Sequence, residues 1–191
     1  MNIGKTLYVT DRKTWRAWLA ENYDKEPEVW LVYYRLETGR PRVPYDHAVE
    51  EALCFGWIDS TVKKIDDERF AQRFSPRKKA STLSQANKER IHKLIAEKKM
   101  TEAGLAAVAH AFDSLDDRQE DFPIPADILA ALKADAQAWE NFQKFPGPYK
   151  RIRIAYIESR RRHGQEAFEK SLRNFIAKTA QNKRFGYVKV E

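Results

Sequence analysis

The sequence has a single cysteine among its 191 residues, which excludes an internal disulfide and gives no reason to expect an oxidising compartment. Its four histidines are scattered, and with one cysteine they cannot build a structural zinc site. No apolar run approaches the length of a transmembrane helix, and the first residues, MNIGKTLYVTDRKTWRAW, lack the hydrophobic stretch of a secretory signal. We therefore expect a cytoplasmic protein with no metal site and no cofactor.

The composition predicts a folded protein with an excess of positive charge. Hydrophobic residues make up 42% and aromatic residues 12%, which is ample for a packed core and argues against disorder. Lysine and arginine outnumber aspartate and glutamate by 35 to 28, for a net charge of +7. Such a charge is compatible with an anionic partner, namely nucleic acid, an acidic membrane surface or a phosphorylated ligand, although solubility alone also explains it.

The first part of the sequence combines strands with helices. Leu7-Tyr8-Val9 and Glu28–Leu36 predict strands, and Trp57–Ile65 with Arg69–Ser75 predicts a hairpin. Helices are expected at 13–22, capped by Asp11, and at 45–55, 84–98 and 101–112. On the second hairpin strand Phe70, Gln72 and Phe74 share one face, and Arg69, Ala71 and Arg73 share the other. The fold class is therefore α+β, with helices near residues 13, 46 and 87 covering one face of a small antiparallel sheet.

Beyond residue 112 the sequence predicts only helices. The acidic run 114–122 followed by Pro-Ile-Pro is typical of a linker. Three helices are expected, at 126–145, 149–162 and 165–179, and the tail 182–191 reads as a short strand or a loose end. We predict an α+β domain at 1–112, a linker at 113–125 and an all-helical region at 126–191.

The stretch Tyr45–Ser60 is the most distinctive in the sequence and predicts a helix that ends at Gly56, where glycine can take a left-handed conformation. His47 and Glu51 are four residues apart and so share a helix face, but a metal needs three or four ligands and no second such pair is present.

Cys54 lies in the last turn of this helix, where the helix dipole disfavours a thiolate. We expect it to be a buried structural cysteine.

The turn at Gly56 is where we expect a binding pocket. A half-buried carboxylate among aromatic residues can have a raised pKa that suits acid–base chemistry, but buried charges are usually paired, so an ion-pair network is the simpler interpretation. The predicted ligand-binding residues are Glu50, Trp57, Asp59, Arg73, Asn87 and Arg90. We expect that replacing Asp59 or Arg73 destabilises the protein or empties the site, because it leaves a buried charge without a partner.

Two basic segments, within 74–90 and 150–163, indicate an alternative function in nucleic-acid binding. Their candidate phosphate-contacting residues are Arg77, Lys78, Lys79, Lys150, Arg153, Arg160, Arg161 and Arg162. Lysine and arginine bind phosphates, and neighbouring aromatic residues can stack on bases. No helix-turn-helix, RNA-recognition motif or glycine-rich phosphate loop accompanies these residues.

A long ordered motif resembles the YdeI/OmpD-associated family of bacteriocin-protection proteins. It consists of Tyr45, the run Ala48–Ser60, the run Arg73–Arg77, Ser81, Ser84, Asn87, Arg90, Met100 and the run Ala103–Leu105, within residues 5 to 112. The C-terminal helices resemble that family's second region through Phe142, Pro148-Tyr149, Tyr156-Ile157 and Arg160-Arg161. Between the last two helices the family carries a basic residue followed by Glu-Thr-Arg, whereas this sequence reads RHGQEAF at 162–168.

This resemblance implies a cytoplasmic bacterial α+β protein, with a sheet packed on helices as in the YjbR/CyaY-like fold. It implies neither catalytic residues nor a cofactor, and bacteriocin protection names a phenotype rather than a mechanism. The first hypothesis is therefore a non-enzymatic protection protein that binds a small anion, a peptide or a protein partner. The second is a nucleic-acid-binding protein. An enzyme is less well supported, because no nucleophile, base and stabilising group can be named together.

Overall fold

The computed structural model describes residues 3–78, 81–112 and 122–186. These residues divide into two compact units, the first formed by those within 1–83 and 90–117 and the second by those within 84–89 and 118–191. Each unit has its own hydrophobic core. Of the predicted linker, residues 113–121 lie outside the described residues, while Phe122 and Ile124 pack against the core of the second unit. The predicted α+β class, with a helical C-terminal region, is confirmed.

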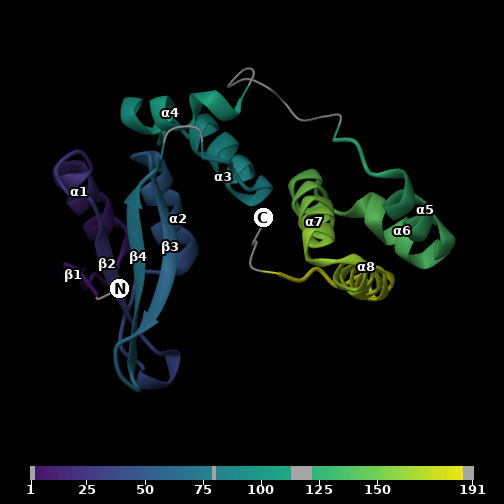
Figure 1. The fold of residues 1–191 in the computed structure, drawn as a ribbon, viewed down its shortest axis with the longest axis horizontal. Coiled ribbons are helices and arrows are strands. Elements are labelled where there is room, and N and C mark those ends of the chain that lie inside the picture. Colours follow the sequence, from purple (N-terminus) through teal and green to yellow (C-terminus); the bar gives the residue numbers. More distant parts are fainter. Residues whose placement is uncertain (1–2, 79–80, 113–121, 187–191) are drawn as a thin grey trace. The chain divides into compact units, whose positions relative to one another are not determined.

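The first unit is built on a four-stranded sheet in the order β1-β2-β4-β3 (Figure 1). Its elements are β1 (Thr6–Leu7), α1 (Arg12–Asn22), β2 (Val29–Tyr34), the 3-10 helix η1 (Leu36–Thr38), α2 (Tyr45–Cys54), β3 (Trp57–Lys64), β4 (Arg69–Pro76), the part of α3 (Gln85–Ala96) from residue 90 onward, α4 (Glu102–Val108) and the 3-10 helix η2 (Ala109–Ala111). The pairs β2–β4 and β3–β4 are antiparallel, as predicted. β1 runs parallel to β2, because the helix α1 carries the chain back between them, so the sheet is mixed.

Helix α1 begins where the sequence predicts, because Asp11 caps it. The Asp11 carboxylate accepts a hydrogen bond from the backbone N–H of Thr14 at 2.9 Å. The buried side of the helix carries Trp15 and Leu19, both fully buried. The Trp15 indole donates to the carbonyl of Ala48 in α2 at 3.0 Å. The two helices therefore pack side by side, and their buried residues share one core with the sheet.

The sheet has one face toward this core and one away from it. Val29, Leu31 and Tyr33 alternate along β2 and belong to the core. Their partners on β4 are Phe74, Gln72 and Phe70, as the predicted alternation requires. The other face carries Trp30 opposite Arg73, and the Lys63 ammonium lies over the Trp30 ring at 5.5 Å. Long charged side chains thus cover Trp30, which is fully buried, on the face turned away from the core.

The end of α2 is the most tightly packed turn of the first unit. Gly56 has a φ of +74°, which is the left-handed conformation predicted from the sequence and one that favours glycine. The Cys54 carbonyl accepts from both the hydroxyl and the backbone N–H of Thr101, at 2.6 and 3.0 Å. A β-carbon on Gly104 would lie only 2.1 Å from the same carbonyl oxygen. Helix α4 therefore rests backbone to backbone on the end of α2.

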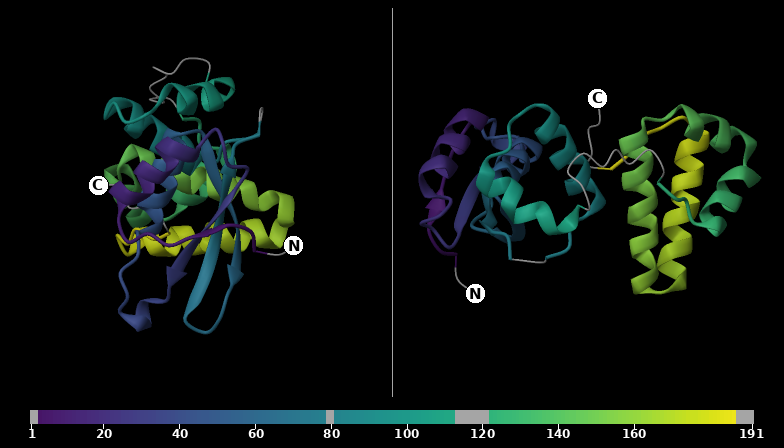
Figure 2. Two further views of the ribbon diagram at one scale, coloured as in Figure 1. Left: turned by 90° about the vertical axis from the view of Figure 1, so that its left-hand side faces the viewer. Right: turned by 90° about the horizontal axis from the view of Figure 1, so that it is seen from above.

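The second unit consists of helices in its described residues. Outside the short segment 84–89 they are α5 (Ala126–Ala134), α6 (Ala136–Lys144), α7 (Gly147–Ser159), the 3-10 helix η3 (Arg160–His163) and α8 (Gln165–Ala180). Helix α8 packs against α5, α6 and α7, and its course beside α7 is visible in Figure 2. Fully buried core residues include Ile128, Leu132 and Phe175. Residues 182–186 form no strand, and 187–191 lie outside the described residues.

The prediction of a single helix at 126–145 is wrong, because the helix is interrupted at Asp135 and forms α5 and α6. Asp135 has extended backbone angles, φ −107° and ψ 104°, and its carboxylate accepts from the backbone N–H of Ala138 at 2.9 Å. The aspartate thus acts as the N-cap of a new helix. The apolar spacing continues across the break, which is why periodicity alone reads one helix.

We predict that Gly104→Ala lowers the free energy of unfolding by about 3 kcal/mol, because the added methyl group meets backbone atoms that have no room to move. Chemical denaturation of the two proteins, followed by circular dichroism, measures the difference. Ala106→Ser is the matched control, since Ala106 is exposed on the same helix and its replacement costs only about 0.5 kcal/mol. Equal effects of the two substitutions would contradict the close packing of α4 on α2.

Candidate functional site

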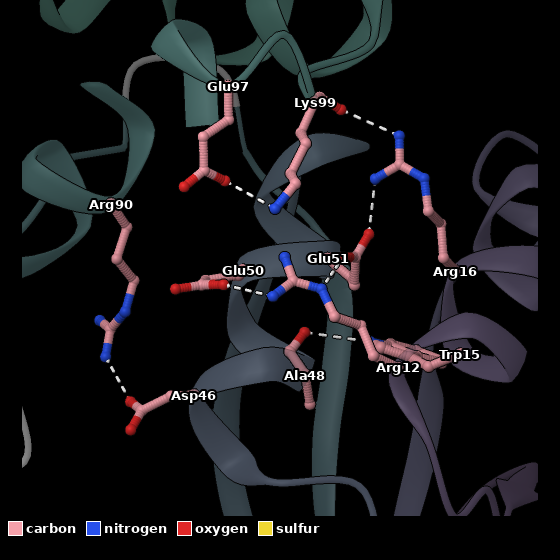
Figure 3. A network of polar contacts seen from close by, with 10 residues as sticks. All are labelled: Arg12, Trp15, Arg16, Asp46, Ala48, Glu50, Glu51, Arg90, Glu97 and Lys99. Atoms are coloured by element: carbon pink, nitrogen blue, oxygen red, sulfur yellow. Dashed lines mark hydrogen bonds and ion pairs between the residues drawn. The ribbon is translucent and has the colours of Figure 1, made fainter. Parts of the chain in front are cut away.

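Glu51 is a buried carboxylate at the centre of an ion-pair network in the first unit (Figure 3). It is 2% exposed, and its carboxylate pairs with the guanidinium groups of Arg12 and Arg16, the latter at 2.6 Å. Arg16 also donates to the backbone carbonyl of Lys99 at 2.9 Å. A buried charge is tolerated only when it is paired and hydrogen-bonded. The network therefore fixes α1 against α2 and against the turn that follows α3.

The predicted ligand residue Glu50 belongs to the same network. Its carboxylate lies 2.8 Å from Arg12 Nη1. Burial alone would lower the pKa of Arg12, but the hydrogen bond and charge of Glu51, with the charge of Glu50, outweigh burial and raise it. Both carboxylates thus meet a permanently charged guanidinium. This arrangement suits a structural role better than acid–base chemistry.

Cys54 is fully buried at the end of α2, as the sequence predicts. Burial raises the pKa of its thiol, although the neighbouring Arg16 acts in the opposite direction. A thiol with a raised pKa is protonated at neutral pH, and the thiolate is the reactive form. The geometry therefore favours a structural cysteine over a nucleophile.

Trp57 and Asp59 lie at the start of β3 and differ in accessibility. Trp57 is 1% exposed, and its indole donates to the Tyr23 carbonyl at 2.9 Å, so it belongs to the core. The Asp59 carboxylate accepts from the Tyr45 hydroxyl at 2.7 Å. Burial and this hydrogen bond raise the pKa of Tyr45. Asp59 is thus the more accessible of the two predicted residues.

The side chains of Arg73 and Asp59 lie on opposite faces of the sheet, although their backbones are neighbours. Asp59 pairs in register with Phe74 on the core face, whereas Arg73 points to the other face because side chains alternate along β4. There Arg73 binds Glu28 at 2.6 Å and donates to the Ser60 hydroxyl at 3.3 Å. The two charges have separate partners.

The remaining predicted ligand residues, Arg90 and Asn87, lie on α3. Arg90 pairs with Asp46 at the start of α2, at 2.8 Å (Figure 3). Asn87 is 8% exposed and is grouped with the second unit. Glu50, Arg73 and Arg90 thus have three different ion-pair partners. A ligand contact by any of the six residues stays a prediction.

The first basic segment offers little free positive charge among its described residues. Arg77 is 9% exposed, and its guanidinium donates to the Thr82 carbonyl at 2.7 Å. Burial lowers the pKa of Arg77. Lys78 is exposed, and Lys79 lies outside the described residues. Phosphate contact by Arg77 would require this buried side chain to move.

The second basic segment is also partly used within the protein. Arg153 is 9% exposed, with its guanidinium 4.1 Å from the Phe185 ring centre and 4.9 Å from that of Tyr156. Arg161 pairs with Asp127 at 2.6 Å and with Glu158 at 2.9 Å. Lys150 and Arg160 are half-buried, and Arg162 is exposed. Arg153 and Arg161 are thus engaged by other side chains of the second unit.

The second unit contains a cavity of about 470 Å³, which the sequence did not predict. Its lining residues are Phe122 and Ile124, Trp139, Phe142 and Gln143 of α6, and Gly147, Lys150, Arg151 and Ile154 of α7. A volume of this size lies within the range of small-molecule sites, roughly 300 to 1,000 Å³. Most of its larger side chains are aromatic or aliphatic. The cavity is a candidate ligand site.

The polar side of this cavity is positive. The Lys150 ammonium lies 5.4 Å above the Phe142 ring and donates to the Gln143 carbonyl at 3.1 Å. The guanidinium of Arg151 is already ion-paired. Helix α7 starts at Gly147 with no acidic residue in its first turn and no side-chain cap, so its free N–H groups add partial positive charge. An anion with an apolar part fits these surroundings.

The sequence did carry a signal for this cavity. Trp139 and Phe142 are three residues apart, so they share a helix face, and Lys150 follows shortly after the break at Pro146-Gly147-Pro148. From the sequence we expected Trp139 to point into the core, and we used Phe142 only as a residue of the family resemblance. The packing of α6 against its neighbours decides which of its aromatic residues line a cavity. The hydrophobic periodicity of the sequence does not contain that information.

Neither a metal centre nor a membrane-spanning helix is found in the part of the chain that the structure describes. No three His, Cys, Asp or Glu side chains come together there as metal ligands would. Glu51, which we considered with His47 as a metal ligand, is occupied by two arginines. No helix in this part is long and apolar enough to cross a bilayer.

Comparison with known proteins assigns the two parts of the chain to different families. The family described as "Domain of unknown function (DUF8412)" matches residues 7–107. The family described as "Bacteriocin-protection, YdeI or OmpD-Associated" matches residues 121–182, which confirms the predicted resemblance for that region and includes the whole cavity. The motif at 45–105, on which we based most of the resemblance, lies instead within the first match. No curated protein and no solved structure matches the chain.

We predict that Glu51→Gln lowers the free energy of unfolding by about 3 kcal/mol, because it leaves the partly buried guanidinium of Arg16 without its carboxylate and that of Arg12 with Glu50 alone. Urea denaturation followed by tryptophan fluorescence is suited to this test, since four of the five tryptophans precede residue 58. Asp67→Asn is the control, because the Asp67–Lys64 pair is at the surface and its loss costs less than about 0.5 kcal/mol. A Glu51→Gln protein as stable as the control would show that the network contributes nothing.

We predict that Cys54 does not react with a thiol reagent such as DTNB in the native protein at pH 8. Burial both shields the thiol and raises its pKa, so the thiolate fraction is lower than that of a free cysteine at this pH. The same measurement in guanidinium chloride should give rapid labelling of one thiol per chain. Rapid labelling of the native protein would contradict the structural assignment.

Proposed function

This chain belongs to the DUF8412 family of domains of unknown function, and we propose that it is a non-enzymatic protein that binds a small anionic ligand. The observation that carries this proposal is the cavity of about 470 Å³ between residues 122 and 154, with its apolar wall and positive rim. The description of the family that matches this region suggests a protective role, and we propose that ligand binding serves that role in the bacterial cytoplasm.

The chemistry of the cavity supports binding rather than catalysis. Its lining contains an amide, Gln143, and two cationic side chains, Lys150 and Arg151, but none of its described residues is a carboxylate, histidine, cysteine or hydroxyl residue. Acid–base or nucleophilic catalysis pairs a reactive group with a second one in hydrogen-bonding reach, and Lys150 has no carboxylate, histidine, cysteine or hydroxyl partner among the described lining residues. A cation beside an apolar wall instead provides affinity and orientation. Binding is therefore the function that these residues support.

Nucleic-acid binding through 74–90 and 150–163 is the competing proposal, and it has less support. Arg161 is neutralised by two carboxylates, and Arg153 and Arg77 are buried. The two hypotheses differ in salt dependence, because binding to phosphate backbones weakens steeply with salt and binding in a cavity need not.

We predict that small anions with an apolar part raise the melting temperature of the full chain, as any ligand of the native state does. Thermal unfolding in the presence of a panel of carboxylates, phosphates and sulfonates measures the shift. Lys150→Glu should abolish it, because the substitution places a negative charge at the rim. Lys144→Glu is the matched control, since Lys144 is on the surface of α6 and does not line the cavity.

A melting temperature that no anion raises, or one that rises equally in the Lys150→Glu protein, would contradict the proposal. Fluorescence anisotropy with labelled DNA and RNA tests the alternative. Binding that falls steeply with salt, and that is lost when Arg160, Arg161 and Arg162 are replaced by glutamine, would favour nucleic acid over the cavity ligand.

A further inference from the structure

We propose that the ligand of this cavity is a flat aromatic anion, whose ring packs against Trp139 and whose charged group binds Lys150. This inference rests on the proposed function and goes further, because it specifies the chemical class of the ligand. It follows from the three aromatic side chains in the wall and from the one lysine at the rim that no carboxylate neutralises among the described residues.

The wall of the cavity is suited to a planar ring. Phe122, Trp139 and Phe142 contribute three aromatic side chains, and the Trp139 and Phe142 rings are 5.9 Å apart with an angle of 22° between their planes. Phe142 is 3% exposed, whereas Trp139 is half-buried and so remains reachable. Aromatic pairs contribute stabilisation beyond the area that they bury. A flat ring therefore gains more here than a saturated ring of similar size.

Lys150 is the cation that selects for negative charge. Its ammonium has three donors, and among the described residues its one hydrogen bond is to the carbonyl oxygen of Gln143. Arg151, the other cation of the lining, is ion-paired, and Lys144 pairs with Glu140 at 2.7 Å. Arg153 and Lys133 do not line the cavity, although the Lys133 ammonium lies 5.3 Å from the centre of the Trp139 ring. Two donors of Lys150 thus remain for a ligand, and a charged acceptor makes the stronger hydrogen bonds.

The apolar and cationic groups are adjacent, which sets the shape of the ligand. Lys150 Nζ is 5.4 Å from the centre of the Phe142 ring, so the ammonium lies directly at the aromatic wall. A ligand that fills both positions carries its charge on or next to the ring rather than at the end of a long chain. A ring carboxylate and a ring phosphate both have this chemistry.

The test is isothermal titration of the full chain with four probes of nearly equal size. We expect 2-naphthoate or 2-naphthyl phosphate to bind, and the tighter of the two identifies the charged group. The neutral 2-naphthamide should bind about tenfold more weakly than 2-naphthoate, because it lacks the negative charge that pairs with the Lys150 ammonium. Decahydro-2-naphthoate, which keeps the charge but not the flat ring, should also bind more weakly.

Matched variants link each preference to its residue. Lys150→Gln should weaken 2-naphthoate about tenfold and leave 2-naphthamide unchanged, whereas Lys150→Arg and the control Lys144→Gln should keep the affinity for both. Trp139→Leu should weaken 2-naphthoate more than decahydro-2-naphthoate. Thermal unfolding of each variant confirms that it is folded, and the unchanged binding of 2-naphthamide to Lys150→Gln provides a second check.

The possible failures separate the two proposals. If decahydro-2-naphthoate binds as tightly as 2-naphthoate, and Lys150→Gln weakens both, the flat-ring inference is wrong and the small-anion function stands. If 2-naphthamide binds as tightly as 2-naphthoate, the site does not discriminate between charged and neutral ligands, and both proposals are wrong. If none of the probes binds, no evidence for an anion site remains and both are again overturned.

Discussion

The first unit depends on a buried negative charge that must be neutralised. Glu51 is 2% exposed on α2, and only the guanidinium groups of α1, from Arg12 and Arg16, make that burial tolerable (Figure 3). The same arginines bind Glu50 and the Lys99 carbonyl, so one electrostatic requirement sets the position of α1, α2 and the turn after α3. The hydrophobic core beneath them is less specific, because apolar contacts do not fix orientation.

Local signals in the sequence predicted most of the helices and strands. The start of α1 at Asp11 and the end of α2 before Gly56 could be predicted, because an N-cap and a left-handed turn each depend on a single residue. The break at Asp135 was missed, because an aspartate inside an apolar repeat reads equally well as a solvated helix residue. The parallel pairing of β1 was missed for another reason, since strand direction depends on how α1 returns the chain.

The candidate site was much harder to predict than the fold. We expected the fold to bring charged residues from distant parts of the sequence together at Gly56, whereas Glu50, Arg73 and Arg90 each have an ion-pair partner of their own. Side-chain alternation on β4 also separates Arg73 from Asp59. In the second unit the opposite holds, because packing of helices with ordinary apolar sequences creates a cavity beside Lys150, whose ammonium no carboxylate neutralises in the described residues. The spacing of Trp139, Phe142 and Lys150 is visible in the sequence, but whether these residues enclose a cavity depends on how the helices pack.

The most direct test of the central claim, that the cavity of the second unit binds small anions, is the nuclear magnetic resonance spectrum of the tryptophan indole groups. The chain has five tryptophans, and Trp139 is the one that follows residue 57. Trp139→Phe assigns its signal in the ¹⁵N-labelled protein. Titration with 2-naphthoate should move the Trp139 signal and leave the other four in place. Movement of those four signals with an unchanged Trp139 signal would contradict the account.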